Sequence, residues 1–107
     1  MIVFKAGIDS VDIYDIIWKE AYIDKLEWKH GVNTEEVEQV LFGEPFVRRG
    51  NKGSIQGEDL YIAYGQTATG RYLIVFFVFK PKQNAALPIS SRDMTPAERR
   101  YYASQKK

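Results

Sequence analysis

Cysteine is absent from this sequence of 107 residues, so disulfide bonds and thiolate metal sites are excluded. A single histidine leaves no imidazole cluster for a metal ion. The longest hydrophobic run is too short to span a bilayer as a helix, and the first residues lack the layout of a signal peptide. No glycine-rich loop joins a strand to a helix, and no serine occupies a nucleophile elbow. We therefore expect a cytoplasmic protein with no cofactor and no membrane partner.

The composition indicates a folded domain. Hydrophobic residues make up 45% of the chain and aromatic residues 14%, which is enough for a packed core. A chain of this length buries roughly 60–70% of its unfolded surface. We predict one domain over residues 1–107.

Charge is divided unevenly along the chain. Residues 1–44 carry four Lys and ten Asp or Glu, a net charge of −6. Residues 45–107 carry eleven Lys or Arg and four Asp or Glu, a net charge of +7. This division is typical of a basic surface for a polyanion set against an acidic face. The alternative is that the two halves interleave in space and their charges mix.

Two segments in the middle of the chain have the composition of β-strands. Residues 60–65 are rich in β-forming residues, and residues 72–79 form an unbroken run of β-branched and aromatic residues. Such a run suits a strand covered on both faces. The loop between them ends at Gly70, which can adopt the positive φ that hairpin loops often need. The pattern predicts a central hairpin that the rest of the chain must cover.

The N-terminal part predicts one strand and two helices. Residues 11–18 suit an edge strand, and residues 19–29 follow a helical stripe that leaves Trp28 at a boundary or exposed. Gly31 is placed to end this helix. A second helix starts with the capping-box spacing of Asn33 and Glu36. Its core-facing residues are Val37, Val40 and Leu41.

The C-terminal part predicts two strands, over residues 46–50 and 87–92, and a mobile loop over residues 51–57. Pro88 confines the last strand, or its start, to an unpaired edge. Thr95, Pro96 and Glu98 are an N-cap, a first-turn proline and a capping-box partner, so a helix should run from residue 96 to 105. The fold class is α+β: an antiparallel sheet of about four strands, with two N-terminal helices and one C-terminal helix against one face.

The chemistry that remains is cationic and aromatic. Arg48 and Arg49 lie in one predicted strand, Arg71 opens the central strand, and Arg92 ends the last one. Because strand ends of an antiparallel sheet can meet at one rim, Arg71 and Arg92 can converge. Arginine pairs bidentately with phosphate, and tyrosine stacks on unpaired bases. The final helix adds Arg99, Arg100, Tyr101 and Tyr102.

These groups also have structural interpretations. The arginines and tyrosines can line the edge of the core and pair with Glu98 or Glu58. His30, at the end of a helix, can cap it as a cation or act as an acid or base near neutral pH.

Three groups of residues carry a family resemblance when taken together. The first is Trp18, Lys29-His30-Gly31-Val32, Glu35-Glu36-Val37 and Val40-Leu41-Phe42. The second is Glu58, Gly65 and Gly70-Arg71-Tyr72-Leu73. The third is Ile89-Ser90-Ser91-Arg92, Asp93-Met94-Thr95 and Glu98-Arg99-Arg100-Tyr101. Over residues 11–103, in the same order, the sequence resembles the BrnT-type toxins.

The resemblance implies a RelE-like fold and a metal-independent endoribonuclease, in which the RNA 2′-hydroxyl attacks the adjacent phosphate. It implies a small DNA-binding antitoxin (BrnA-like) as partner, and a homodimer or a toxin–antitoxin hetero-oligomer. By position, Arg92 would stabilise the phosphate with help from Arg71, and Lys29 and His30 would transfer protons or add positive charge. The implied RNA-binding residues are Arg99, Tyr102, Arg48 and Arg49.

The sequence departs from the family at two positions. Leu26 and Leu60 stand where the family often has Asn and Arg. The alternative function is therefore a non-catalytic module that binds a protein or RNA on the same fold.

Overall fold

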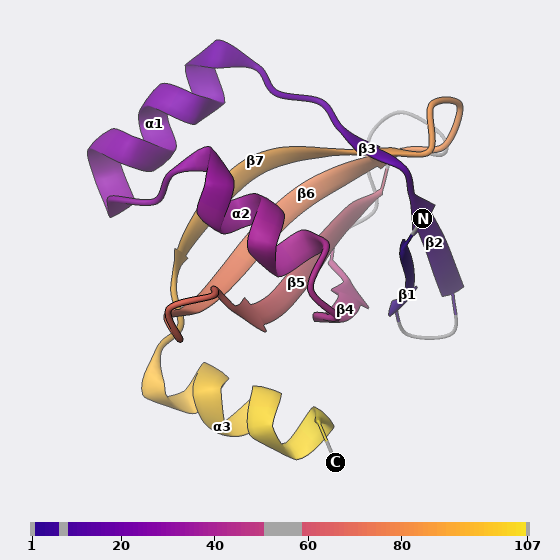
Figure 1. The fold of residues 1–107 in the computed structure, drawn as a ribbon. Helices are drawn as coiled ribbons and strands as arrows, with labels where there is room; N and C mark the ends of the chain where they lie inside the picture. Colours follow the sequence, from indigo (N-terminus) through magenta and orange to yellow (C-terminus); the bar gives the residue numbers. More distant parts are fainter. Residues whose placement is uncertain (1, 7–8, 51–58, 107) are drawn as a thin grey trace.

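A computed structural model describes residues 2–6, 9–50 and 59–106, so the predicted loop over residues 51–57 and Glu58 lie outside the described residues. The described chain forms three helices and a mixed sheet (Figure 1). The strands are β1 (Ile2–Ala6), β2 (Asp9–Ile13), β3 (Asp15–Ile16), β4 (Phe46–Arg49), β5 (Leu60–Gln66), β6 (Tyr72–Lys80) and β7 (Ala85–Asp93). The helices are α1 (Glu20–His30), α2 (Thr34–Leu41) and α3 (Pro96–Gln105).

The predicted hairpin is the centre of the sheet. Strands β5 and β6 pair antiparallel from Leu60–Val78 to Gln66–Tyr72, and Gly70 has a φ of 92° in their loop. The strand order is β2-β1-β4-β5-β6-β7-β3. The four expected strands are therefore present as β4 to β7, but the prediction of about four antiparallel strands was wrong. Three further strands extend the sheet, and two of its pairings, β1 with β4 and β3 with β7, are parallel.

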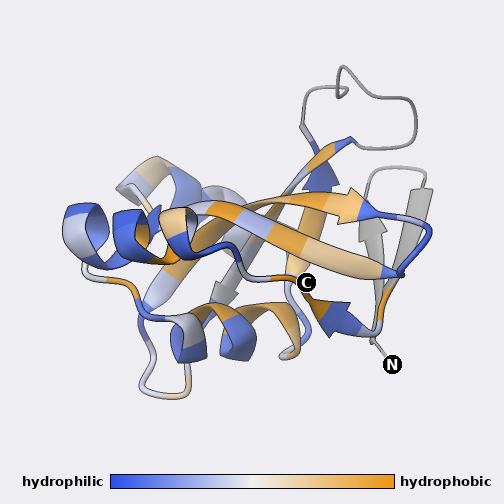
Figure 2. Cartoon of the chain, turned by 90° about the horizontal axis from the view of Figure 1, so that it is seen from above, coloured by the Kyte–Doolittle hydropathy of each residue, from blue (hydrophilic) through white to orange (hydrophobic). Residues whose placement is uncertain are grey.

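Alternation along β5 and β6 divides the core between the two faces of the sheet. On one face, Tyr61, Leu73 and Val75 pack with residues of α1 and α2 such as Leu26, Val37 and Val40. On the other face, Ile62, Tyr64 and Ile74 pack with Met94 and with Tyr102 of α3. The central strand is thus covered on both faces, as its composition indicated. Figure 2 shows hydrophobic residues concentrated in the central strands.

The expectation that all three helices cover one face was wrong. Helices α1 and α2 lie over one face and α3 over the other (Figure 1). The reason is local: Arg92 and Asp93 end β7, and the chain then enters α3 through Met94, which belongs to the second face. A short connection leaves no length to cross to the first face.

The predicted strand over residues 11–18 is two strands at opposite edges of the sheet. Strand β2 pairs with β1 at one edge and β3 pairs with β7 at the other, although Tyr14 alone separates them in sequence. This one-residue link requires the sheet to curve until its two edges approach each other. The fully buried Ile13 fills the core on that side.

Local signals predicted the helix ends well. Gly31 ends α1 with a left-handed φ of 60°, and both predicted capping boxes form, at Asn33–Glu36 and at Thr95–Glu98. Trp28 is 83% exposed, in agreement with the prediction that it lies at a boundary or in solvent. Strand β3 pairs with Ala85 and Ala86 of β7, and Pro88 lies beyond these two residues, beside a bulge. The missing N–H of Pro88 therefore removes no hydrogen bond to β3.

Within the described residues, no helix has both the length and the apolar character needed to cross a membrane.

Gly65 gives a test of the packing between α2 and the sheet. A Cβ at Gly65 would lie 3.0 Å from Val40 Cγ1 and 3.6 Å from Pro45 Cβ. Gly65→Ala should therefore overpack this contact and destabilise the protein by about 1–3 kcal/mol in urea unfolding. Val40→Ala removes the methyl group that would clash. The loss of unfolding free energy in the double variant should therefore be smaller than the sum of the losses in the two single variants. Strict additivity would contradict this close approach.

Candidate functional site

The Arg71 guanidinium donates hydrogen bonds to acceptors at three elements of the fold. Its Nε and Nη2 donate to the two carboxylate oxygens of Asp93 at 2.7 and 3.1 Å. Its Nη1 donates to Glu36 at 3.2 Å and to the Gly31 carbonyl at 2.9 Å, and its Nη2 also donates to the His30 carbonyl at 3.1 Å. The hydrogen bond to Asp93 raises the pKa of Arg71 above its usual value. Arg71 therefore joins the end of α1, the start of α2 and the end of β7.

His30 and Lys29 lie at this same end of α1. His30 is half-buried and Lys29 is exposed. The hydrogen bond from Arg71 lowers the pKa of Asp93, and the positive field of His30 lowers it further. The structure thus brings Arg71 and His30 together, around one carboxylate.

Arg92 makes a separate two-pronged ion pair. Its Nη1 and Nη2 donate to the two carboxylate oxygens of Glu98 at 2.7 and 2.9 Å, and its guanidinium lies over the Phe76 ring at 5.7 Å from the centroid. Glu98 also accepts from the Thr95 N–H as part of the α3 capping box. Hydrogen bonding from Arg92 lowers the pKa of Glu98 from 4.5 to about 2.

Arg71 and Arg92 lie at the same end of the β6–β7 pair, but they serve opposite faces of the sheet. Arg92 is opposite Ile74, whose side chain is on the α3 face, whereas Asp93, the partner of Arg71, is opposite Leu73 on the other face. Successive strand residues point to opposite sides. The two arginines therefore meet at one residue, Arg71 at the Asp93 carboxylate and Arg92 at the Asp93 carbonyl, but they do not line one pocket. The structural alternative for Arg92, pairing with Glu98, is present.

A pocket of about 320 Å³ lies between α3 and the sheet. We call it the Arg48 pocket; it is lined by Arg48, Tyr64, Ala97, Glu98 and Tyr101. Arg48 Nε donates to the Tyr64 hydroxyl at 3.1 Å. Arg92 is not a lining residue, but it is bound to Glu98, which is one. One guanidinium group, a phenol and a carboxylate thus line this site, and a second guanidinium group is held next to the carboxylate.

Arg49 does not join this pocket. It is paired with Asp59 at 3.3 Å and donates to the Tyr61 hydroxyl at 3.4 Å, on the face that α1 and α2 cover. The alternation of β4 sends the two neighbouring arginines to opposite faces.

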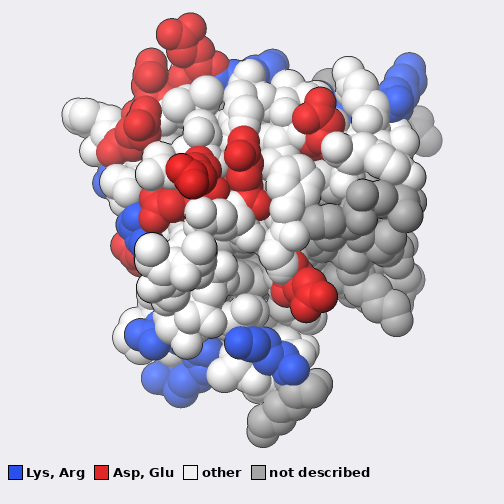
Figure 3. Space-filling model, viewed as in Figure 1, with Lys and Arg blue, Asp and Glu red and all other residues white. Residues whose placement is uncertain are grey.

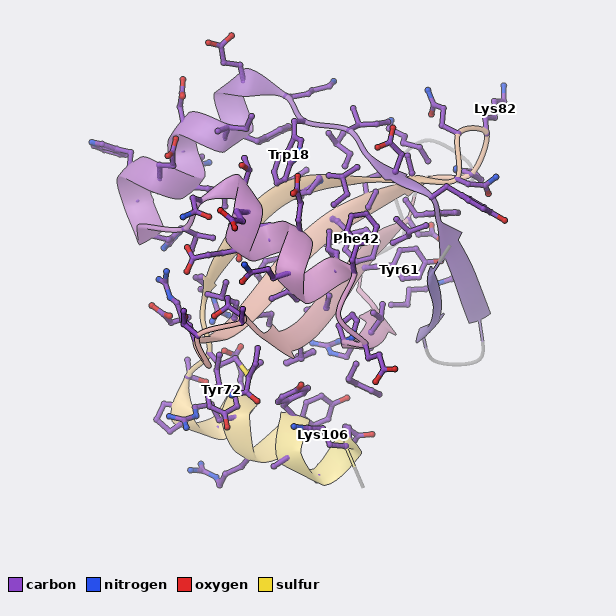
Figure 4. All side chains as sticks on the ribbon, viewed as in Figure 1. Trp18, Phe42, Tyr61, Tyr72, Lys82 and Lys106 are labelled. Atoms are coloured by element: carbon purple, nitrogen blue, oxygen red, sulfur yellow. The ribbon has the colours of Figure 1, made fainter. Side chains whose placement is uncertain are left out.

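A second pocket, of about 260 Å³, lies along α3. We call it the Arg99 pocket; it is lined by Tyr72, Arg99, Arg100, Tyr102, Ala103 and Lys106. The Arg99 guanidinium lies 4.1 Å from the centroid of the Tyr72 ring. Lys106 Nζ lies 5.0 Å from the centroid of Tyr102. Figure 4 shows Tyr72 beside α3, and Lys106 is the C-cap residue that follows this helix.

Charge is separated in space as well as in sequence. In Figure 3, acidic side chains gather over α1 and α2, while Lys and Arg gather at α3. The charges of the two halves are therefore not evenly mixed on this face, and the basic surface is at the helix that lines both pockets. Across the part of the chain that the structure describes, no three His, Asp or Glu side chains are grouped as they would be to hold a metal ion.

Sequence reasoning missed several residues of the two pockets. None of Tyr64, Tyr72, Glu98 and Lys106 is assigned to a binding site from the sequence, although Tyr72 and Glu98 belong to the family resemblance and Glu98 is named as a possible partner of an arginine. The alternation of β5 could have placed Tyr64 on the same face as Arg48, had the register been known. The spacing of Arg99, Tyr102 and Lys106 at i, i+3 and i+7 could have shown that they share one side of the helix.

Comparison with known proteins identifies a family. The sequence model of the family described as "Ribonuclease toxin, BrnT, of type II toxin-antitoxin system" matches residues 18–98. Among solved structures, the 1.1 Å crystal structure of the Brucella abortus ribonuclease toxin BrnT is similar, with a TM-score of 0.55 and 22% identity. That match covers 76% of this chain and 96% of the Brucella chain. No curated protein matches.

Arg71 should act as a scaffold, since all three of its guanidinium nitrogens donate to protein acceptors. Arg71→Ala leaves Glu36, Asp93 and two helix-end carbonyls without this donor and should cost about 2–4 kcal/mol in urea unfolding. Arg71→Lys should recover less than half of that loss, because an ammonium cannot reproduce the planar fork. Full recovery by lysine would show that charge alone matters here.

The Arg92–Glu98 pair predicts a loss of stability in acid. The folded pKa of Glu98, about 2, lies below its ordinary 4.5, so its stabilisation is complete above about pH 5 and is lost as the pH falls towards 2. Because Arg92 is 35% exposed, solvent screening should reduce the effect to about 1–2 kcal/mol. Glu98→Gln should remove this part of the pH dependence of urea unfolding and leave the part due to Asp93. A Glu98→Gln variant as acid-sensitive as the parent would contradict the assignment.

Proposed function

The chain belongs to the BrnT family of ribonuclease toxins of type II toxin–antitoxin systems, and on that premise we propose that it cleaves single-stranded RNA without a metal ion. The observation that carries the proposal is the Arg48 pocket, where a phosphate can meet Arg48 and Tyr64 while Glu98, which also lines the pocket, holds Arg92 beside it. Arginine forks match phosphate oxygens, and a cluster of fixed cations stabilises charge that develops on them.

The reaction we propose is an internal transfer. The RNA 2′-oxygen gives its proton to a solvent water molecule and attacks the adjacent phosphorus, the bond from phosphorus to the 5′-oxygen breaks, and that oxygen takes a proton from an acid of the pocket. The products are a 2′,3′-cyclic phosphate and a 5′-hydroxyl end. Arg48 and Arg92 stabilise the extra charge on the phosphoryl oxygens.

Tyr64 is our candidate for the acid. Its hydroxyl oxygen accepts a hydrogen bond from Arg48 Nε, which leaves its own proton available for the departing 5′-oxygen. Glu98, with a pKa of about 2, is ionised at neutral pH but is a weak base, so we assign it to holding Arg92 in place.

Lys29 and His30 remain candidates for proton transfer at a different place. They lie at the end of α1, beside Arg71 and Asp93, on the opposite face of the sheet from Arg48. Arg71 enters the proposal as the residue that holds this end of α1 against β7. Variants at His30 and Tyr64 therefore report which face carries the chemistry.

The rest of the proposal follows from the family. A type II toxin implies a protein antitoxin, for which we propose a small DNA-binding protein of the BrnA type, in a hetero-oligomer in the cytoplasm. We also propose that the fold is RelE-like, as the resemblance implies. A second function, RNA binding without cleavage, is favoured by one observation: both terminal nitrogens of Arg92 already donate to Glu98, so the RNA phosphate must compete with a carboxylate.

The test is cleavage of a labelled RNA by the purified protein in excess chelator. The parent should release a 2′,3′-cyclic phosphate, and Arg48→Ala should lower kcat about 10²–10³-fold. Tyr64→Phe should lower kcat about 10²-fold or more, while His30→Asn should leave it within a few-fold. Lys82→Ala, an exposed cation on the turn far from α3 in Figure 4, is the matched control and should change nothing.

Three outcomes would revise the proposal. Intact RNA with the folded parent protein removes the enzyme and leaves the binding module. Cleavage that appears only when Mg²⁺ is restored removes metal independence. A large loss in His30→Asn with no loss in Tyr64→Phe moves the chemistry to the α1 end.

A further inference from the structure

We propose that the Arg99 pocket is a nucleotide subsite in which one unpaired base stacks on Arg99 while the adjoining phosphate meets Arg100 and Lys106. This rests in part on the proposed function, because it gives the RNA a second point of attachment beside the Arg48 pocket. It adds a substrate requirement that cleavage alone does not demand, namely an unstacked base at a fixed place.

The Arg99 guanidinium is already arranged for stacking. Its Cζ lies over the Tyr72 ring, 4.1 Å from the centroid, in a close cation–π contact. Arg99 is an exposed residue, so a ligand from solvent can reach it. Unpaired bases of RNA stack on tyrosine rings and on arginine planes. A base placed on Arg99 would continue the layer that begins with Tyr72.

Tyr72 is itself fixed, so the layer is built before a ligand arrives. Its ring packs edge-to-face on Tyr102, with centroids 6.3 Å apart and an interplanar angle of 77°. Tyr102 is 5% exposed, and Met94, next to it in the core, donates its backbone N–H to the Tyr72 carbonyl at 3.1 Å. A prearranged platform loses little conformational entropy on binding.

The charge of the pocket selects an anion. Its lining contains Arg99, Arg100 and Lys106 and no carboxylate, and none of these three cations forms an ion pair with a described residue. Arg71 and Arg92, by contrast, are each paired with carboxylates. The Arg99 pocket therefore holds cations that can meet a phosphate without first releasing a carboxylate.

The size of the pocket favours part of a polymer over a whole small ligand. Its volume of about 260 Å³ is below the roughly 300–1,000 Å³ of pockets that enclose drug-sized molecules. It shares helix α3 with the Arg48 pocket, which is lined by Ala97, Glu98 and Tyr101 of the same helix. One RNA strand that crosses α3 can occupy both pockets.

The experiment measures binding separately from cleavage. A fluorescent single-stranded 2′-O-methyl oligonucleotide cannot be cut, because its 2′-oxygen carries no proton, and its Kd is read by anisotropy. Arg99→Gln and Tyr72→Leu should each raise Kd about tenfold, as expected for loss of one stacked base. Lys82→Gln removes the same charge as Arg99→Gln at a distant exposed site and should raise Kd less than twofold. Thermal melts establish that each variant is folded.

Three further readouts identify the ligand. Arg100→Gln, which removes a cation assigned to the phosphate, should reduce the slope of log Kd against log salt by about 0.7, the value for one phosphate contact with a single strand. A fully paired duplex of the same length should bind at least tenfold more weakly than the single strand, since its bases are not free to stack. A mononucleotide should compete only weakly, because it reaches one subsite.

Several results would overturn the subsite. The first is an equal rise in Kd for Arg99→Gln and Lys82→Gln, and the second is a duplex that binds as tightly as the single strand. The third is a poly-glutamate peptide that competes as well as RNA, which would indicate an acidic protein partner. The proposed function can fail independently. If the parent cuts no RNA but Arg99→Gln still loses oligonucleotide affinity selectively, the subsite stands without the enzyme. If the parent cuts RNA and Arg99→Gln leaves KM and Kd unchanged, only the subsite is lost.

Discussion

Two carboxylates, those of Glu36 and Glu98, each fix the start of a helix by the same pair of interactions. Glu36 and Glu98 are each the third residue of a helix, where they accept the N–H of the N-cap residue. Glu36 also pairs with Arg71, which directly precedes β6, and Glu98 pairs with Arg92 of β7. Because an ionised carboxylate can accept several hydrogen bonds, one side chain can finish a helix and fix its position on a strand. Arg71 thereby holds α2 on one face of the sheet, and Arg92 holds α3 on the other.

These two ion pairs also determine which cations remain available to an anionic ligand. The family resemblance places Arg71 and Arg92 at the phosphate, but each of them is paired with a carboxylate that caps a helix. Arg99, Arg100 and Lys106 of the Arg99 pocket form no ion pair with a described residue. Arg48 donates to the hydroxyl of Tyr64 and forms no ion pair with a described residue. The cations that carry no carboxylate partner among the described residues thus lie on the α3 face, and the α1–α2 face supplies much of the acidic surface (Figure 3).

The α3 face also has the polar and aromatic groups that recognition of RNA requires. The Arg48 pocket has a phenol that accepts from a guanidinium group, and the Arg99 pocket has a guanidinium group over the Tyr72 ring. The helix between them is fixed at its start by the Arg92–Glu98 pair and near its end by the buried Tyr102. A rigid helix with a site on each side is a suitable support for an extended strand.

The sequence by itself determined the features that depend on neighbouring residues. The hairpin of β5 and β6, both capping boxes, the end of α1 at Gly31 and the limits of α3 all follow from spacing and composition, because their hydrogen bonds close within a few residues. Tertiary structure alone decided the features that depend on register and on which face an element covers. The separation of Arg71 from Arg92, the split of residues 11–18 between the two sheet edges, and the meeting of Arg48 with Tyr64 all depend on pairings across the sheet. A shift of one residue there would send every side chain to the other face, and no local pattern specifies that choice.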